Sequence, residues 1–379
     1  MKILLFANTD WYLYNFRRSL AEQLRDLGRE VVLVSPPGKY GEKLRALGFR
    51  WIPFPFSTKS LNPFSELAVL VNLIRLYRAE RPDLAHHFTI KCVIYGSIAA
   101  YLAGKVPTVN AVTGLGHVFT DAGLKMRILQ PVVKMLYRLI FSLNSAHMRI
   151  IFQNTEDRDF FVQQGLAPGS LTHIIRGSGV DCLHFRPPQP VEVRGPGPVK
   201  ILFASRMLKE KGLAELVAAV KMLRTRGVDI RVILAGDIYP ENPSSLTKED
   251  ITEMCTDSVM IYAGHHDDIR QLIAECDIVV LPSYREGSPR ILIEAAAMAK
   301  PIVATKIAGC MGIVEEGVNG LLVPVGDAAA LAEALERLVR NRGLRETMGK
   351  AGRRIALAEF SDEIVLQKTF AVYHELLPR

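Results

Sequence analysis

The chain has 379 residues, of which 49% are hydrophobic, 8% aromatic and 23% charged. These fractions are close to globular averages, so they exclude a large disordered or fibrous part, and the length predicts two domains of roughly 150–200 residues each. The formal net charge of +8 and the pI near 9.2 predict an anionic partner, which is a nucleotide, a nucleic acid or a lipid surface.

Cysteine usage and hydropathy bear on the cellular compartment. The five cysteines have neither the CxxC nor the CxxH spacing of metal and redox motifs, so we expect them to be buried in a reducing cytoplasm. The N-terminus reaches Asp10 before a signal-peptide apolar region can form, and the longest uncharged apolar run, 92–104, is shorter than the ~18 residues that span a bilayer. We therefore expect a cytoplasmic protein that is not integral to a membrane.

In chain order, the first half alternates short apolar, β-branched runs with segments of helical period, which is the pattern of parallel sheets built from βαβ units. The predicted strands are Lys2–Asn8, Glu30–Ser35, Trp51–Pro55, Asp83–Phe88, Thr108–Ala111, Arg149–Gln153 and Thr172–Ile175. Residues 186–198 then carry a run of Pro and Gly that continues neither helix nor strand. We predict a linker there and a first Rossmann-like domain at residues 1–187.

The second half repeats the alternation. Its predicted strands are Val199–Ala204, Ile230–Gly236, Val259–Tyr262, Ile278–Pro282, Pro301–Thr305 and Gly320–Pro324, and its last helices are Asp327–Arg340, Leu344–Glu359 and Ser361–Leu377, with Ser361 as an N-cap. This pattern predicts a second doubly wound sheet in residues 198–358. Ligands of such folds bind outside the carboxyl ends of the strands, so we expect the site in a cleft between the domains.

Two cations follow the strand Val199–Ala204, at the point where the next helix opens. Arg206 and Lys211 flank that helix N-terminus, where backbone N–H groups and the positive end of the helix dipole favour an anion. This combination is suited to a diphosphate. A solvated basic loop is the alternative interpretation.

Two carboxylates, Glu286 and Glu294, lie eight residues apart after the strand Ile278–Pro282. Pro289 suits a first helical turn, and Glu294 then falls on an otherwise apolar helix, where it needs a partner or a ligand. A carboxylate accepts hydrogen bonds from vicinal hydroxyls, so Glu294 fits a ribose, while Glu286 and the amides near Gly287 and Ser288 fit a sugar. The alternatives are a surface turn for Glu286 and a salt bridge for Glu294.

These residues, with the flanking text "VVLPSYREGSPRILIEAAAMAKPIVAT" and "EEGVNGLLVPVGD", resemble glycosyltransferase family 4, whose enzymes have the GT-B fold. The text "HHFTIKCVIYGSIAA", "NAVTGLGHVF", "GDIYPENPSS" and "YAGHHDDI" extends the resemblance over nearly the whole chain, toward a bacterial branch that acts on lipid-linked surface glycans. Several spaced motifs in the right order are more specific than one Gly-rich loop. The resemblance implies two Rossmann-like domains facing a cleft, with a C-terminal helix, 359–379, that returns to the N-terminal domain.

The resemblance also implies roles for individual residues. Arg206 and Lys211 would stabilise the departing diphosphate in place of a metal ion, Glu286 would contact the transferred sugar, and Glu294 the ribose. The remaining donor-binding positions that it implies are Gly287, Ser288, Pro289, Arg290 and His265, the last near the base. No metal and no cofactor are expected.

The activity implied is retaining, metal-independent transfer of a hexosyl or N-acetylhexosaminyl group from a UDP-sugar to a polyprenyl-diphosphate-linked saccharide. A UDP-sugar epimerase or hydrolase of the same fold, and a catalytically silent nucleotide-binding module, are the alternatives. A nucleic-acid-binding role ranks last, because no recognised reading module is present and the basic stretch has few aromatic residues for base stacking.

The acceptor side is expected in the N-terminal domain, at Asp10, Tyr12, Lys91 and His117. The sequence departs from the family pattern at two positions, one on the acceptor side and one on the donor side. A Gly-Gly loop after the first strand is replaced by Asn8-Thr9-Asp10, and the sequence Gly309-Cys310-Met311-Gly312 lacks the carboxylate that the branch commonly shows near the donor.

Between residues 122 and 155 the cations Lys125, Arg127, Lys134, Arg138 and Arg149 occur without any Asp or Glu, interleaved with apolar residues. A basic amphipathic segment of this kind suits an anionic membrane surface. A core helix with a charged outer face is the alternative. The membrane hypothesis predicts a peripheral protein on the inner face of the plasma membrane.

Overall fold

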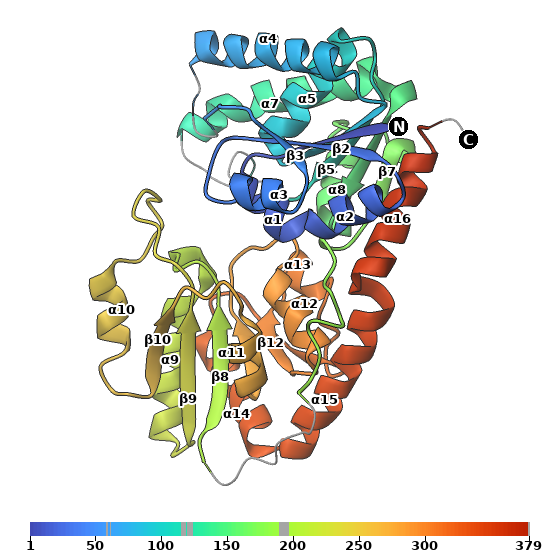
Figure 1. Cartoon of the computed structure of the whole chain (residues 1–379). Helices are drawn as coiled ribbons and strands as arrows, with labels where there is room; N and C mark the ends of the chain where they lie inside the picture. Colours follow the sequence, from blue (N-terminus) through green and yellow to red (C-terminus); the bar gives the residue numbers. More distant parts are fainter. Residues whose placement is uncertain (58–59, 61, 115–118, 120–123, 189–196, 378–379) are drawn as a thin grey trace. The chain divides into compact units, whose positions relative to one another are not determined.

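The structure, a computed structural model, describes residues 1–57, 60, 62–114, 119, 124–188 and 197–377. The chain forms two compact units (Figure 1), one of residues 1–178 with 365–379 and one of residues 179–364. The change of unit at residue 179 comes earlier than the linker expected near residue 187, because Val180 pairs with the segment around Ser361: its N–H donates to Phe360 and its carbonyl accepts from Asp362.

The N-terminal unit contains a seven-stranded parallel sheet of order β3-β2-β1-β4-β5-β6-β7. Its strands are β1 (Lys2–Phe6), β2 (Glu30–Ser35), β3 (Arg50–Pro53), β4 (Leu84–Phe88), β5 (Thr108–Val112), β6 (Met148–Phe152) and β7 (Thr172–Ile174). Its helices are α1 (Asp10–Phe16), α2 (Arg18–Asp26), α3 (Gly41–Ala46), α4 (Pro63–Glu80), α5 (Ile90–Leu102), α7 (Leu124–Leu143) and α8 (Thr155–Gln163), with short η1 (Ser145–His147) and η2 (Gly169–Leu171).

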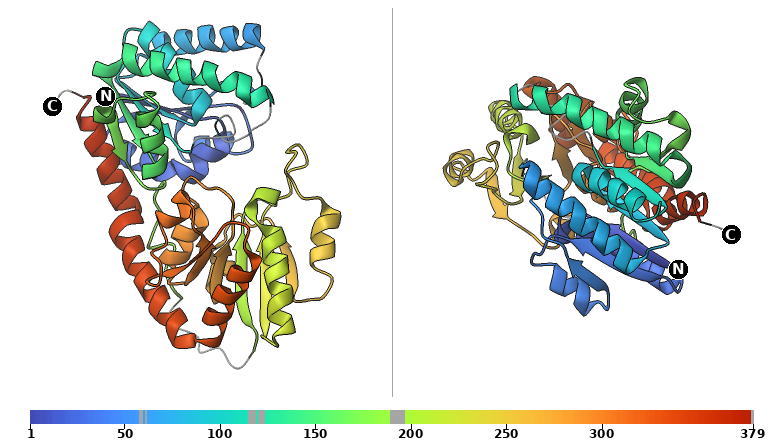
Figure 2. Two further views of the ribbon diagram at one scale, coloured as in Figure 1. Left: turned by 180° about the vertical axis from the view of Figure 1, so that it is seen from behind. Right: turned by 90° about the horizontal axis from the view of Figure 1, so that it is seen from above.

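Both faces of this sheet are covered, which explains the nearly continuous apolar strands in the sequence. Along β1, Ile3 and Leu5 join a core with α1, α2 and α3, whereas Leu4 and Phe6 point to the opposite face and pack with α4 and α5. Figure 2 shows α4, α5 and α7 side by side in one layer over the sheet, and α5 contacts both of its neighbours.

The C-terminal unit contains a six-stranded parallel sheet of order β10-β9-β8-β11-β12-β13. Its strands are β8 (Val199–Ala204), β9 (Ile230–Ala235), β10 (Met260–Gly264), β11 (Ile278–Leu281), β12 (Ile302–Thr305) and β13 (Gly320–Val323). Its helices are η3 (Lys209–Lys211), α9 (Leu213–Thr225), α10 (Lys248–Met254), α11 (Arg270–Glu275), α12 (Arg290–Ala297), α13 (Ala308–Met311), α14 (Ala328–Arg340) and α15 (Arg342–Ile355). The prediction of two doubly wound sheets is confirmed.

The C-terminal segment differs from the expected pair of helices in one detail. A π-helical turn, η4 (Ala356–Phe360), separates α15 from α16 (Asp362–His374). Ser361 caps α16 as predicted, since its Oγ accepts from the N–H of Ile364 at 3.4 Å. From Val365 onward α16 belongs to the N-terminal unit, where the Tyr373 hydroxyl lies 2.7 Å from Nδ1 of the buried His86.

Candidate active site

The loops that carry the predicted site residues flank the point where the strand order of the C-terminal sheet reverses. β8 pairs with β9 on one side and with β11 on the other, so the connections leaving β8 and β11 diverge to opposite faces. A crevice forms at the carboxyl ends of such neighbouring strands, and it is the common ligand position in open α/β sheets. The β8 loop brings Arg206 and Lys211 to this edge, and the β11 loop brings Glu286.

Close backbone packing joins the two loops. Gly212 has φ +75°, and a Cβ at this position would lie 2.1 Å from the carbonyl oxygen of Pro282. The N–H of Tyr284 donates to the carbonyl of Glu210 at 2.9 Å. Only glycine permits this approach, because it has no Cβ and adopts positive φ without strain. The contact places the residue before Gly212 against the β11 loop.

That preceding residue is Lys211, which forms a largely buried ion pair with Glu286. Its Nζ lies 2.6 Å from Oε1 of Glu286, and the two side chains are 9% and 14% exposed. The hydroxyl of Ser283 donates to the same carboxylate oxygen at 2.8 Å. An ion pair held this far from water is costly to break, because either charge alone would remain desolvated. The structure therefore brings together the predicted cation and the predicted sugar-contacting carboxylate.

The loop at Glu286 packs against the end of β12 and against α13. The Thr305 hydroxyl donates to the carbonyl of Ser283 at 2.5 Å. A Cβ on Gly309 would meet the carbonyl oxygens of Glu286 at 2.4 Å and of Gly287 at 2.9 Å. These contacts fix the backbone around Glu286 and Gly287, where the amides expected to hold a sugar lie.

Glu294 lies one turn into α12. The helix begins at Arg290, with Pro289 as the N-cap rather than within the first turn. The Arg290 Nε donates to Oε1 of Glu294 at 2.7 Å, so the salt bridge considered as an alternative is present. Burial raises the pKa of Glu294, although Arg290 opposes the shift. Among the described residues only Oε1 of Glu294 receives a hydrogen bond, and the side chain keeps 10% of its surface exposed, so Oε2 is accessible to a ligand.

Arg206 and His265 lie at the same edge of the sheet but outside this cluster. The Arg206 side chain is exposed, near Tyr239, whose pKa burial and Asp237 raise while Arg206 opposes the shift. His265 follows β10, with Nδ1 at 3.1 Å from Asp237 and Nε2 at 3.2 Å from Asp267. The predicted site residues thus divide into a buried group around Glu286 and an exposed group, Arg206 and His265, beyond β8 and β10.

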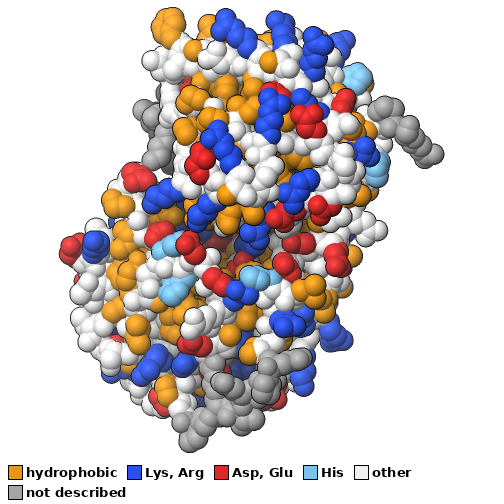
Figure 3. Space-filling view, in the orientation of Figure 1, with side chains coloured by type: hydrophobic (Ala, Val, Ile, Leu, Met, Phe, Trp, Pro, Cys, Tyr) orange, Lys and Arg blue, Asp and Glu red, His pale blue; other side chains and the backbone are white. Residues whose placement is uncertain are grey.

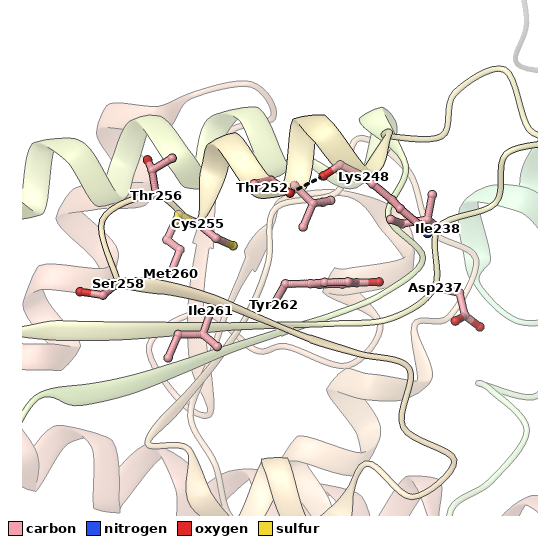
Figure 4. Close-up of a pocket in the computed structure, with 11 residues that line it drawn as sticks. Asp237, Ile238, Lys248, Thr252, Cys255, Thr256, Ser258, Met260, Ile261 and Tyr262 are labelled. Atoms are coloured by element: carbon pink, nitrogen blue, oxygen red, sulfur yellow. Dashed lines mark hydrogen bonds between the residues drawn. The ribbon is translucent and has the colours of Figure 1, made fainter.

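A cavity of about 750 Å³ opens beyond the exposed group, between α10 and β10. Figure 4 shows the Tyr262 ring and Asp237 toward one end, with Thr256 and Ser258 at the other. The cavity shares Asp237 with the His265 contacts, but neither Lys211 nor Glu286 lines it. It is therefore separate from the buried ion pair.

Two of the residues expected on the acceptor side follow β1, beside the order reversal between β1 and β4 in the N-terminal sheet. The Asp10 carboxylate accepts from the backbone N–H groups of Trp11 at 2.8 Å, Tyr40 at 2.7 Å and Gly41 at 2.8 Å. The Tyr12 hydroxyl accepts from Arg17 Nη2 at 2.8 Å. Asp10 therefore holds the start of α3, and Tyr12 orients a buried arginine.

Lys91, after β4, also forms hydrogen bonds and an ion pair within the N-terminal unit. Its Nζ donates to the carbonyls of Ser57 at 2.6 Å and Ser60 at 3.1 Å, and it pairs with Glu66 at 2.9 Å. The lysine thus ties the segment before α4, and α4 itself, to α5. His117 lies outside the described residues.

Sequence reasoning missed Ser283, Thr305 and Gly309, which position Glu286 through hydroxyl bonds and a close backbone approach. The only signal for Gly309 is a glycine after a strand, which is common in loops. It also missed Thr89, a β-branched residue with φ 74° at the end of β4; such strain recurs at functional sites, and no sequence pattern announces it.

The described residues show neither a metal-ligand cluster nor a membrane-spanning helix. They contain no group of three or more His, Cys, Asp or Glu side chains placed to hold a metal ion. Within the same residues, none of the helices has both the length and the apolar character needed to cross a bilayer.

Known proteins resemble the chain over both units. Residues 189–355 match the family described as glycosyl transferases group 1, and residues 2–155 match the family described as glycosyl transferase 4-like. The N,N'-diacetylbacillosaminyl-diphospho-undecaprenol alpha-1,3-N-acetylgalactosaminyltransferase of Campylobacter jejuni is 29% identical over 100% of this chain and 99% of its own length. The capsular polysaccharide biosynthesis glycosyltransferase CapM of Staphylococcus aureus is 25% identical over 95% of this chain and 93% of its own length.

Solved structures agree on the fold. A glycosyltransferase from Rickettsia africae superposes with a TM-score of 0.79 at 22% identity, covering 99% of this chain and 98% of its own. HepE of Anabaena, solved in complex with UDP, superposes with a TM-score of 0.78 at 21% identity, covering 98% of this chain and 99% of its own. The two family matches together span most of the chain, and the resemblance seen in the sequence motifs is confirmed: the chain belongs to glycosyltransferase family 4 and has the GT-B fold.

Proposed function

We propose that this glycosyltransferase moves a hexosyl or N-acetylhexosaminyl group from a UDP-sugar to a polyprenyl-diphosphate-linked saccharide, with retention of configuration and without a metal ion or cofactor. The observation that carries the proposal is the buried Lys211–Glu286 pair at the order reversal of the C-terminal sheet, with the half-satisfied carboxylate of Glu294 on the adjoining helix. Together they supply a cation for a diphosphate and two carboxylates for hydroxyl groups.

Lys211 is the residue placed to act on the leaving group. As the C1–O bond to the diphosphate breaks, negative charge grows on the phosphate, and a fixed cation in a water-poor site stabilises that charge more than the ground state. The new bond from C1 to the acceptor oxygen forms on the same face, and the leaving phosphate oxygen takes the proton of the acceptor hydroxyl. Proton and charge balance without a protein base, and Arg206 adds a second, exposed cation near the phosphates.

Glu286 and Glu294 are placed to select the donor. Sugar hydroxyls donate to the carboxylate of Glu286, which Lys211 and Ser283 hold in one orientation. The ribose hydroxyls donate to Oε2 of Glu294, and these hydrogen bonds offset the cost of keeping a charge on a largely buried carboxylate. His265 then lies on the side of the base.

Related proteins support the substrate classes. The Campylobacter jejuni relative is named for an undecaprenyl-diphosphate-linked acceptor and an N-acetylgalactosaminyl group, and HepE was solved with UDP and with UDP-glucose. We place the same chemistry, a uridine diphosphate leaving group and a lipid diphosphate acceptor, on this chain. A lipid-linked acceptor in turn places the enzyme on the anionic inner face of the plasma membrane, in bacterial surface glycan synthesis.

The test uses charge-balanced variants, because removal of one member of the ion pair leaves the other charge buried, at a cost of ~3–5 kcal/mol in stability. Lys211→Met and Glu286→Gln alone should lose stability and at least about a hundredfold in transfer rate. The double variant Lys211→Met/Glu286→Gln should regain the melting temperature and remain inactive. Recovery of transfer together with stability would show that the pair is only structural.

Acceptor dependence separates the proposal from the two alternatives. A transferase releases UDP only when the lipid-linked saccharide is present, whereas an epimerase or hydrolase consumes the UDP-sugar alone. A silent module binds UDP and turns over neither substrate. Coupled detection of UDP with and without acceptor distinguishes all three.

A further inference from the structure

The outer faces of α4 and α7 carry an unusual concentration of exposed apolar side chains. Of the 21 large apolar side chains exposed among the described residues, eight lie on α4, α5 and α7. On α4 they are Phe64, Leu67 and Val71, and on α7 they are Val132, Met135, Leu139 and Leu143. Their spacing of three and four residues places each set on one face of its helix.

These faces point away from the core. On α4, Leu73 and Tyr77 are buried against the sheet, while Phe64 is 83% exposed. On α7, Val133, Tyr137 and Phe141 fill the core, while Met135 is 59% exposed. Because α5 lies between α4 and α7 and contacts both (Figure 2), the two exposed faces belong to the outer surface of one helical layer.

The charge on this layer is of one sign. Arg75 and Arg78 continue the exposed face of α4, and Arg127 and Arg138 are exposed on α7. The carboxylates on these three helices are Glu66, held by Lys91 and Tyr95, and Glu80, held by Lys2 and Arg50. The described part of the three helices therefore has no exposed carboxylate. In Figure 3, basic side chains gather along the upper edge, over α4, with apolar ones at its left end.

The structure also changes the basis of the membrane hypothesis made for residues 122–155. Three of its cations are engaged within the fold: Lys134 donates to Gln164 at 3.0 Å, Arg138 to the carbonyls of Gln164 and Gly165, and Arg149 to Glu375 at 2.5 Å. Of these three only Arg149, on β6, meets a carboxylate, so Lys134 and Arg138 keep their charge while their side chains are held against residues 164 and 165. The apolar face of α4, with Arg75 and Arg78 beside it, was not singled out in the sequence and adds to this surface.

We propose that the α4–α7 surface, defined as Phe64, Leu67, Val71, Val132, Met135, Leu139 and Leu143 with the arginines beside them, docks onto an anionic lipid bilayer. The apolar side chains enter the boundary between headgroups and acyl chains, and the arginines meet the lipid phosphates. Such surfaces bind through buried apolar area plus attraction to anionic lipid. The inference rests on the proposed function, because a lipid-linked acceptor requires the enzyme to work at a membrane.

The test is flotation of the purified full chain with protein-free vesicles that contain no glycolipid. Vesicles of phosphatidylcholine with about one third phosphatidylglycerol should bind the chain at least about tenfold more than pure phosphatidylcholine at low salt, and less as salt rises. The variant Phe64→Gln/Leu67→Gln/Val71→Gln should lose at least about tenfold in binding. Glutamine keeps the helix propensity of α4, and circular dichroism checks the fold.

A matched control carries the same change on apolar side chains that are exposed elsewhere. Leu27→Gln/Leu183→Gln/Leu357→Gln should bind vesicles like the wild type, since these exposed residues belong to none of the helices α4, α5 and α7. A second test variant, Val132→Gln/Met135→Gln/Leu139→Gln, replaces the first if that one fails to fold. If the wild-type chain does not bind the vesicles that contain phosphatidylglycerol, the inference is overturned and a protein partner is indicated. The inference is also overturned if the control variant loses as much vesicle binding as the α4 variant.

An activity arm separates this inference from the proposed function. With a diphosphate-linked saccharide on a short, water-soluble tail, the α4 variant should transfer sugar at the wild-type rate within about twofold, because its chemistry is intact. Wild-type vesicle binding without transfer to this acceptor would refute the proposed function and leave the docking surface standing. Transfer to this acceptor without vesicle binding would refute the docking surface and leave the proposed function standing.

Discussion

A single methyl group at Gly309 tests how closely the loop at Glu286 is positioned. In Gly309→Ala the new Cβ would lie 2.4 Å from the carbonyl oxygen of Glu286 and 2.9 Å from that of Gly287, whereas ordinary contacts begin at 3.4 Å. Relief requires a shift of about 1 Å. Gly309 and Cys310 are buried in the core, so the more exposed loop moves rather than α13.

A displacement of ~1 Å at catalytic groups lowers rates by about a hundredfold, or roughly 2.7 kcal/mol of transition-state stabilisation. The variant removes no polar or charged atom, so the loss would come from geometry alone. We expect kcat/KM for sugar transfer to fall by about that factor, with a cost in unfolding free energy of about 1–3 kcal/mol from overpacking. Initial rates of UDP release and a thermal melt measure the two effects.

Gly312 provides the matched control. It lies three residues after Gly309, at the end of α13, and a Cβ there would meet only carbonyl oxygens at 3.5 and 3.6 Å. Gly312→Ala should keep kcat/KM within about twofold. If a folded Gly309→Ala variant transfers sugar as fast as Gly312→Ala, the position of the Glu286 loop does not limit catalysis and the reasoning fails.

Three further predictions concern charge. Glu294→Gln should raise the dissociation constant of UDP at least about tenfold, which calorimetric titration measures. The same variant should not lower the melting temperature at neutral pH. Burial raises the pKa of Glu294, so ionising this carboxyl costs folding free energy as pH rises through that pKa. EDTA should leave transfer unchanged, and activity restored only by a divalent ion would contradict the proposed role of Lys211. Burial lowers the pKa of His87 from 6.5 to about 4, so below pH 6.5 the unfolded state binds a proton that the folded state does not, and this histidine should lower stability by about 1.4 kcal/mol per pH unit until pH 4. Burial also lowers the pKa of His86, which adds to the slope. The fall in stability should therefore be less steep, by about the share of one histidine, in His87→Gln than in His147→Gln.

The architecture could be predicted from the sequence because the hydrophobic pattern determines it. Strands buried on both faces appear as apolar runs whatever their neighbours, so the predicted strands, from Lys2–Asn8 to Gly320–Pro324, correspond to the observed ones. The boundary between the units was less predictable. The Pro-Gly run near residue 187 indicates where regular structure stops, but the pairing of Val180 with Ser361 is a long-range contact without a local signal.

The site was predictable as residue types but not as contacts. Glu286 and Lys211 were identified from the sequence, whereas their 2.6 Å ion pair depends on the approach of Gly212 to Pro282 from a distant part of the chain. Asp10 shows the opposite outcome. A carboxylate after the first strand suggests a ligand, yet its oxygens accept backbone N–H groups at the start of α3, because the loop after β2 folds back onto it.

We propose above all that a sugar passes from a UDP-sugar to a diphosphate-linked saccharide with retention of configuration. Proton NMR of the anomeric signals during turnover tests it most directly, with an α-linked UDP-sugar and a polyprenyl-diphosphate-linked acceptor in EDTA. We expect an α-linked product that grows in step with UDP and only when acceptor is present. A β-linked product, or release of UDP with free sugar in the absence of acceptor, would contradict it.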